Sequence, residues 1–146
     1  MKTIKSTFLL VLAFLVLALL STYSFSATTP FENFQSHVEK AKLGDSEAQY
    51  ELGKLYFNGR GVEKSYTEAF KWYKKAAEKG LPAAQYGLGE LYENGWGVKQ
   101  SYTETFKWYK KAAEKGFPQA LLGLGALYAT GLGHGERSLF QNVTAR

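Results

Sequence analysis

Residues 62–80 read VEKSYTEAFKWYKKAAEKG and residues 98–116 read VKQSYTETFKWYKKAAEKG, so the two stretches agree at 16 of 19 positions. A second set of residues precedes each stretch with the same spacing of 36 and also occurs a third time. The first copy of this set is Ala48, Leu52, Gly53, Tyr56, Gly59 and Gly61. The third copy is Ala120, Leu124, Gly125, Tyr128, Gly131 and Gly133. Self-similarity at a fixed period of this size indicates stacked units of supersecondary structure.

The first half of each unit has the pattern of a helix, which we call helix A and expect over 46–57, 82–93 and 118–129. Its apolar side repeats at helical spacing, as in Ala48, Leu52, Leu55 and Tyr56. Asp45 can cap the first copy, and a proline opens each of the other two. A glycine inside a helix costs about 1 kcal/mol relative to alanine. The glycine repeated at 53, 89 and 125 therefore predicts a close backbone approach by a neighbouring helix.

The second half of each full unit predicts another helix, helix B, over 66–79 and 102–115. Ser65 with Glu68, and Ser101 with Glu104, form capping boxes. A broad apolar stripe indicates the buried side, formed by Tyr66, Ala69, Phe70, Trp72, Tyr73, Ala76 and Ala77. The opposite side is rich in lysine and is expected to be solvated surface, with a patch for an anionic partner as the alternative.

This order of motifs resembles the Sel1-like repeat family, whose members are related to tetratricopeptide repeats. The resemblance covers residues 45–133 and implies an all-α fold, an α/α solenoid that serves as an adaptor. We divide the array into 45–80, 81–116 and an incomplete 117–133, which makes two full repeats with a half repeat at each end. Before it, residues 27–44 are expected to hold only a partial helix, the end of a helix B, and residues 134–146 an irregular tail.

The first 26 residues have the three-part layout of a secretory signal. Lys2 and Lys5 give a positive start, residues 8–20 are apolar without a break, and a more polar stretch follows. This apolar run is shorter than the ~20 residues that a helix needs to cross a membrane. We expect cleavage after Ser26 and a periplasmic or secreted protein, with an uncleaved membrane anchor as the alternative.

Charge and composition argue against several classes of function. Residues 27–146 carry 16 basic and 13 acidic side chains, and only three of the basic residues are arginines, so nucleic-acid binding is not expected. Two histidines, His37 and His134, stand in no metal-ligand spacing, and no phosphate-binding loop occurs. We therefore expect neither a metal nor a cofactor.

Cysteine-rich members of the family that this chain resembles are associated with β-lactamase activity. Serine enzymes of that kind need a Ser-x-x-Lys motif, whereas Ser65 and Ser101 are each followed by glutamate at the third position. The chain also contains no cysteine. We expect no catalysis, and keep a β-lactamase-like envelope hydrolase, or a truncated fragment without a function of its own, as alternatives.

The remaining candidate for function is a surface that binds a protein or peptide. In tetratricopeptide-like stacks helix A lines the groove, and its outer side varies between the copies here. The groove candidates are Tyr50, Lys54 and Phe57 in the first copy, Tyr86, Glu90 and Glu93 in the second, and Trp96, which replaces Arg60 in the following turn. Packing within the stack is the alternative role of Tyr50 and Tyr86, and end-to-end self-association is a further possibility.

Overall fold

The computed structural model describes residues 9–18 and 29–132 of the chain. Within residues 29–132 the secondary structure consists of helices without a strand, and every helix has 13 residues. They are α2 (Pro30–Lys42), α3 (Ser46–Asn58), α4 (Tyr66–Glu78), α5 (Pro82–Asn94), α6 (Tyr102–Glu114) and α7 (Pro118–Thr130). The predicted helices A and B lie within about one residue of these bounds. The predicted tail at 134–146 lies outside the described residues.

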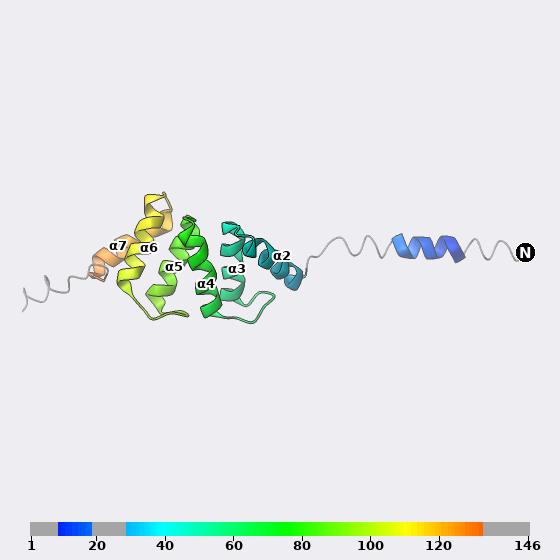
Figure 1. The fold of residues 1–146 in the computed structure, drawn as a ribbon, viewed down its shortest axis with the longest axis horizontal. Coiled ribbons are helices and arrows are strands. Elements are labelled where there is room, and N and C mark those ends of the chain that lie inside the picture. Colours follow the sequence, from blue (N-terminus) through cyan, green and yellow to red (C-terminus); the bar gives the residue numbers. More distant parts are fainter. Residues whose placement is uncertain (1–8, 19–28, 133–146) are drawn as a thin grey trace, which may run out of the picture.

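The helices follow one another as an α/α solenoid, which confirms the predicted fold (Figure 1). Each helix packs against the helix before it and the helix after it. The helix A copies α3, α5 and α7 thus alternate with α2, α4 and α6. Three apolar clusters between the alternating helices form the core along the array.

The first helix, α2, is a complete helix B, whereas the sequence predicted only the end of one. It begins 36 residues before α4 and ends in the same register. Thr29 and Glu32 form a capping box, with the Thr29 amide donating to the Glu32 carboxylate at 2.9 Å. Phe34 is buried and meets Tyr56 edge to face at 5.5 Å, as the corresponding aromatic pairs do in the next two repeats. Within the described residues 29–132, the array therefore begins with a complete helix B.

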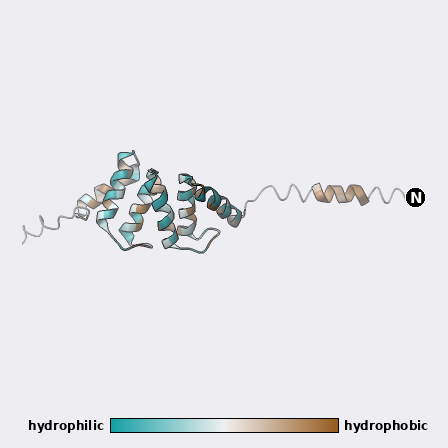
Figure 2. Cartoon of the chain, viewed as in Figure 1, coloured by the Kyte–Doolittle hydropathy of each residue, from teal (hydrophilic) through white to brown (hydrophobic). Residues whose placement is uncertain are grey.

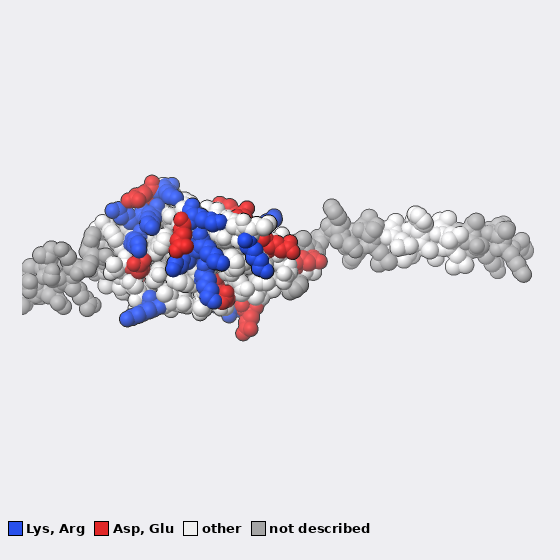
Figure 3. Space-filling view, viewed as in Figure 1, with Lys and Arg blue, Asp and Glu red and all other residues white. Residues whose placement is uncertain are grey.

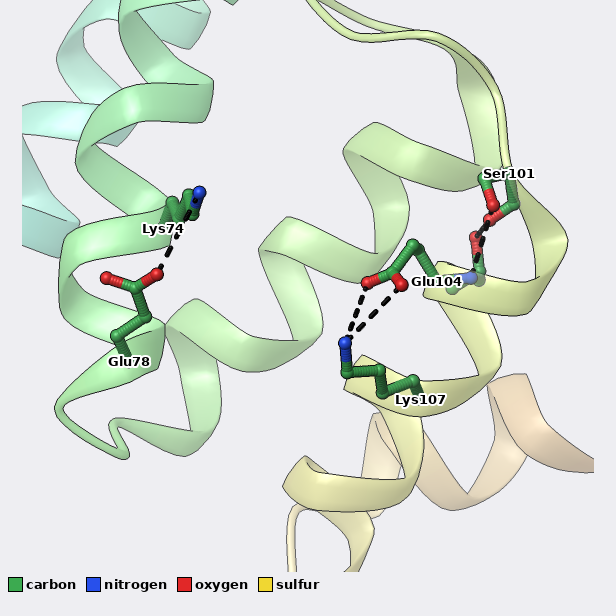
Figure 4. A network of polar contacts seen from close by, with 6 residues as sticks. Lys74, Glu78, Ser101, Glu104 and Lys107 are labelled. Carbon is green, nitrogen blue, oxygen red and sulfur yellow. Dashed lines mark hydrogen bonds and ion pairs between the residues drawn. The ribbon is translucent and has the colours of Figure 1, made fainter.

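The aspartate and the serines predicted as caps accept hydrogen bonds at the helix starts. Asp45 accepts one from the Ala48 amide at 2.8 Å. Ser65 and Ser101 accept one from the third residue of their helices at 3.3 Å, as Figure 4 shows for Ser101. Only this half of the two predicted capping boxes forms, because the serine amides donate to the Tyr56 and Tyr92 carbonyls and not to the glutamates. Prolines open α5 and α7, and a left-handed glycine ends each of α3, α5 and α7. These local signals set the helix boundaries.

Tyrosine rings from helix B fill the space beside the repeated glycines of helix A. A Cβ atom added at Gly53 would lie 2.6 Å from Cε1 of Tyr73, and one at Gly89 would lie 2.6 Å from Cε1 of Tyr109. The close approach predicted at these glycines is therefore made by a side-chain ring, and the expected backbone approach was wrong. At Gly125 a Cβ would meet nothing within 4 Å.

Polar contacts link each repeat to the next across the stack. The buried amide groups of Gln49 and Gln85 each donate to a carbonyl near the end of the preceding helix B at 3.1 Å. The ammonium groups of Lys79 and Lys115 donate to the carbonyls of Gly44 and Gly80, which end the helix B one repeat earlier. These contacts tie equivalent positions together along the array.

The helix over residues 9–18 is apolar throughout and lies apart from the solenoid in Figure 2. Its residues fall in the predicted signal segment, whose remaining residues lie outside the described part of the chain. Among the described helices, none combines the length and the apolar character needed to span a bilayer. Signal cleavage stays a prediction.

Candidate functional site

Five of the predicted groove residues lie together on α3 and α5. Tyr50 and Lys54 stand one helical turn apart on α3, and Tyr86, Glu90 and Glu93 occupy the corresponding side of α5. All five side chains are half-buried. We call this set the α3–α5 strip. On α7 the equivalent positions are Leu122, Ala126 and Ala129, so the charged character of the strip ends with α5.

The α3 part of the strip rests on the tyrosine that fills the space beside Gly53. The rings of Tyr50 and Tyr73 stack with their centroids 5.4 Å apart, at an angle of 30°. The Lys54 ammonium lies 5.2 Å from the centroid of the Tyr50 ring and 2.7 Å from the Glu51 carboxylate. Tyr50 therefore packs on α4, which is the alternative role considered for it, while part of its side chain stays accessible.

The α5 part repeats this stack and adds a hydrogen bond. The rings of Tyr86 and Tyr109 stack at 5.1 Å and 15°, and the Tyr109 hydroxyl donates to Oε2 of Glu93 at 2.5 Å. The residue equivalent to Glu93 in the first repeat is Phe57, which cannot accept such a bond. The two parts of the strip thus share a frame of stacked tyrosines but differ in polarity.

Burial sets the protonation of the strip. It raises the pKa of Tyr86 to about 12, and the charge of Glu90 adds to this rise. Burial also raises the pKa of Glu90, while a hydrogen bond with Tyr86 lowers it and the charge of Glu93 raises it. The pKa of Tyr109 lies far above its ordinary value because of burial and its bond to Glu93. Near neutral pH these tyrosine hydroxyls are uncharged groups that donate hydrogen bonds.

The lysines of α4 and α6, in contrast, have partners on their own helices. Figure 3 shows basic side chains gathered over these two helices. Lys71 and Lys107 each form an ion pair with the glutamate that precedes them by three residues, at 2.6 and 3.3 Å, and Figure 4 shows the pair of Lys107 with Glu104. Lys75 and Lys111 lie over tryptophan rings at 4.2 and 4.3 Å from the centroids. This pairing agrees with the prediction of a solvated lysine face.

Within the described residues, Glu90 and Glu93 form no ion pair. Glu90 carries its charge in a partly dehydrated position, and its neighbour Glu93 has the same sign. A carboxylate in such a place is less favourably solvated than one at the open surface. An incoming group that brings positive charge or hydrogen-bond donors would relieve this cost.

Phe57 and Trp96 lie apart from the strip, in an aromatic cluster at the loop end of the repeats. Trp96 stacks on Tyr66 at 5.6 Å and meets the edge of Phe57 at 5.3 Å. The side chain of Trp96 remains 37% exposed. Gly97, with φ +70°, brings its turn against the first residues of α4, where a Cβ would lie 2.6 Å from the Thr67 amide nitrogen. Both predicted residues thus link neighbouring repeats as well as facing the surface.

A cavity of about 530 Å³ adjoins the strip at Lys54. It lies between α2, α3 and the turn after α3, and its lining mixes donors with a carboxylate and apolar groups. The lining residues are Asn33, His37, Glu51, Lys54, Leu55, Asn58, Arg60 and Gly61. Of these residues only Lys54 was predicted as a site residue from the sequence. Asn33 and His37 were missed because α2 was not recognised as a full helix. The Thr29–Glu32 capping box and the phenylalanine spacing could have revealed it.

The described residues contain no group of three or more histidine, cysteine or acidic side chains that could hold a metal ion. His37 faces the cavity and its Nδ1 lies 2.8 Å from the Asn33 carbonyl oxygen. His134 lies outside the described residues. The surface therefore offers stacked aromatic rings, hydrogen-bond donors and charges, which are the groups that proteins use to bind other proteins.

Comparison with known proteins gives a family match from residue 46 to residue 141 and solved structures that cover 68 to 71% of this chain. The Sel1 repeat profile matches residues 46–81, 82–117 and 118–141. A protective antigen of uropathogenic Escherichia coli strains, which displays an SLR fold, is 46% identical with a TM-score of 0.67 over 68% of this chain and 21% of the antigen. A Sel1 repeat protein from Oxalobacter formigenes is 38% identical with a TM-score of 0.67, over 71% of this chain and 42% of that protein.

A third similar structure is cysteine-rich protein B of Helicobacter pylori. It is 27% identical with a TM-score of 0.63, over 70% of this chain and 77% of its own. The curated proteins gave no match. The chain thus spans about a fifth of the E. coli antigen and less than half of the O. formigenes protein.

Proposed function

Because the chain belongs to the Sel1-repeat family, whose members generally mediate protein–protein interaction, we propose that it is an exported scaffold that binds a protein or peptide on the α3–α5 strip. One observation carries the choice of surface. Glu90 and Glu93 are half-buried without an ion pair among the described residues, whereas the lysines of α4 and α6 are paired on their own helices. A partner with basic groups would therefore compensate the two carboxylates of the strip.

The chemistry of the strip favours an extended polar segment that carries a basic side chain. Glu90 and Glu93 would accept hydrogen bonds from a lysine or arginine, whose cation could also lie against the Tyr86 ring. Lys54 and the adjoining cavity could hold a carboxylate or a backbone carbonyl of the same segment. Tyrosines stacked on a second ring lose little conformational freedom on binding, which favours affinity.

The binding surface can be tested by photo-crosslinking in the cells that produce the protein. A benzoyl-phenylalanine at Lys54 would capture a partner bound on the strip, and one at Lys74, on the outer side of α4, serves as the matched control. We expect a discrete adduct from position 54 and none from position 74. Glu90→Lys in the position-54 variant should remove the adduct without lowering the melting temperature by more than a few degrees.

The pattern of adducts shows whether the partner binds on the α3–α5 strip or on another surface of the chain. Equal adducts from both positions, or an adduct that survives Glu90→Lys and Glu93→Lys together, would place the partner elsewhere on the chain. Tyr50 and Tyr86 are left intact in this design because each stacks on a core tyrosine. Their replacement would mix the loss of binding with a loss of stability.

Export is tested separately by the mass of the protein recovered from the cell envelope and the medium. Cleavage after Ser26 gives a chain that starts at Ala27, and we expect this species outside the cytoplasm. A chain that keeps residues 1–26 and sediments with membranes would support the anchor instead. The lack of any processed or membrane-bound form would contradict the proposed export.

A further inference from the structure

The last helix, α7, carries an apolar face that no described residue covers. Leu121, Leu122 and Tyr128 are exposed by 57, 76 and 57%, and Gly125 and Ala129 lie between them. At 100° per residue these side chains share one side of α7, opposite the side that Ala120 and Leu127 bury against α6. No residue of α7 carries a charge. A helix that is apolar on all sides is normally buried on all sides.

The earlier repeats show what kind of neighbour this face accommodates. On α3 and α5 the same side is covered by the next helix B, whose tyrosine ring lies beside Gly53 or Gly89. At Gly125 that space is open, with nothing within 4 Å of an added Cβ. An aromatic ring beside Gly125 would therefore complete the third repeat in the same way.

The helix itself presents such a ring. Tyr128 lies three residues after Gly125 on the same face and meets Phe106 edge to face at 5.5 Å, which leaves its outer side exposed. Two antiparallel copies of α7 around a two-fold axis level with the Ala126–Leu127 bond would place each Tyr128 opposite Gly125 of the other. The face is thus complementary to itself, as a two-fold interface requires.

The opposite end of the array does not offer an equivalent partner for α7. In α4 the residues Ala69, Tyr73 and Ala76 are buried. The equivalent residues of α2, one repeat earlier, are the polar Asn33, His37 and Lys40. Head-to-tail stacking would bury these polar groups and the Lys40 charge against leucines, which is costly. The N-terminal end therefore has the polar surface of a terminal cap, while the α7 end does not.

We propose that a second copy of this chain docks on α7 through its own α7. The two chains then form a tail-to-tail dimer that leaves both α3–α5 strips free. The uncharged helix brings no like charges together in such a dimer. An apolar contact on α7 also removes three large exposed side chains, Leu121, Leu122 and Tyr128, from water. This assignment does not depend on the function proposed for the strip.

The absence of cysteine from the sequence makes a crosslinking test direct. Ala126→Cys places a single thiol beside the exposed face of α7, level with the proposed two-fold axis. Lys40→Cys places a single thiol on α2, at the opposite end of the array. A short bismaleimide should link two Ala126→Cys chains into a dimer and should leave Lys40→Cys chains monomeric. Adding Leu122→Asp should lower the dimer yield at least tenfold, while Leu43→Asp, at another exposed leucine, should not.

Each other result overturns the proposal. Crosslinks that form only in a mixture of the two cysteine variants would show head-to-tail stacking. A monomer that crosslinks only after removal of residues 133–146 would show that these residues cover α7. Failure to crosslink with or without them would show that α7 serves a different partner. Because Leu122 is exposed, an unchanged helical circular dichroism signal for Leu122→Asp separates lost docking from lost folding.

Discussion

At the scale of single residues, equivalent glycines of the repeat are expected to respond to alanine with opposite signs. Gly89→Ala places a Cβ 2.6 Å from Cε1 of the buried Tyr109 ring. Overpacking costs about 1–3 kcal/mol, and better helix propensity returns about 1 kcal/mol, so we expect a net loss of about 1–2 kcal/mol. Gly125→Ala meets nothing and should raise the free energy of unfolding by up to about 1 kcal/mol.

Urea denaturation at a concentration where the chain is monomeric measures both changes. Equal effects at the two positions would mean that the ring of Tyr109 does not occupy the space beside Gly89. A loss at Gly125 under these conditions would mean that another part of the chain lies against it. The comparison needs no other control, because the same substitution is made at equivalent positions of two copies of helix A, α5 and α7.

The charge of Glu90 is expected to make stability depend on pH. Burial raises its pKa above the ordinary value of 4.5, so the folded chain binds this proton more readily than the unfolded chain does. Folding therefore becomes less favourable as the pH rises from 4.5 through the folded pKa. Glu90→Gln removes this term and can still bond to Tyr86, so the variant should be more stable than the parent at pH 7.

That advantage of Glu90→Gln should shrink as the pH falls below 4.5, where both states of the parent are protonated. Denaturation midpoints of the two proteins at pH 7 and pH 4 give the comparison. Glu78→Gln, at an exposed ion pair on α4, serves as the control and should show little change. A Glu90→Gln variant that is less stable at pH 7 would contradict the assignment.

At the scale of elements, α2 is expected to be an integral part of the fold. Phe34 is buried against Tyr56, in the arrangement that the later repeats use between Phe70 and Tyr92. Phe34→Ala should therefore destabilise the chain by about 3–5 kcal/mol. Hydrogen exchange should show loss of protection in α2 first, followed by α3. Protection in α2 that is unaffected by the substitution would mean that the helix stands without the stack.

The helices could be predicted from the sequence because their signals are local. Asp45, Ser65, Ser101 and the repeated proline and glycine positions mark the ends, and the period of 36 fixes their register. The full length of α2 was missed because Asn33, His37 and Lys40 replace the apolar residues of helix B. In α4 the corresponding residues are buried against the preceding helix A, and no described helix A precedes α2. The apolar stripe that predicts a helix B is therefore interrupted by polar residues in α2.

The candidate surface was predicted less completely than the helices. Spacing on helix A placed Tyr50, Lys54, Tyr86, Glu90 and Glu93 on one side, and the structure brings them together. Spacing does not show how far one helix is displaced from the next, and this displacement determines which rings meet. The stack of Tyr50 on Tyr73 and the contact of Phe57 with Trp96 depend on it.

At the scale of the whole molecule, the array behaves as a one-dimensional stack with two unlike ends. From α2 to α7 every helix packs mainly on its neighbours in the chain, so stability should increase with each repeat that is added. Helices α4 and α6 differ only at Ala69 and Thr105. A second copy of residues 66–101, inserted after Ser101, therefore repeats the native interfaces, except that Ala69 stands in place of Thr105 where the copied α4 packs on α5.

We expect this longer chain to fold with a higher free energy of unfolding and a larger urea m-value, since more surface is exposed when it unfolds. Equilibrium denaturation followed by circular dichroism measures both quantities. An insertion of the same composition in scrambled order is the control and should raise neither. A lengthened chain that unfolds at a lower urea concentration than the parent would contradict the additive stack. It would mean that contacts between distant parts of the chain, rather than neighbouring repeats, hold the array together.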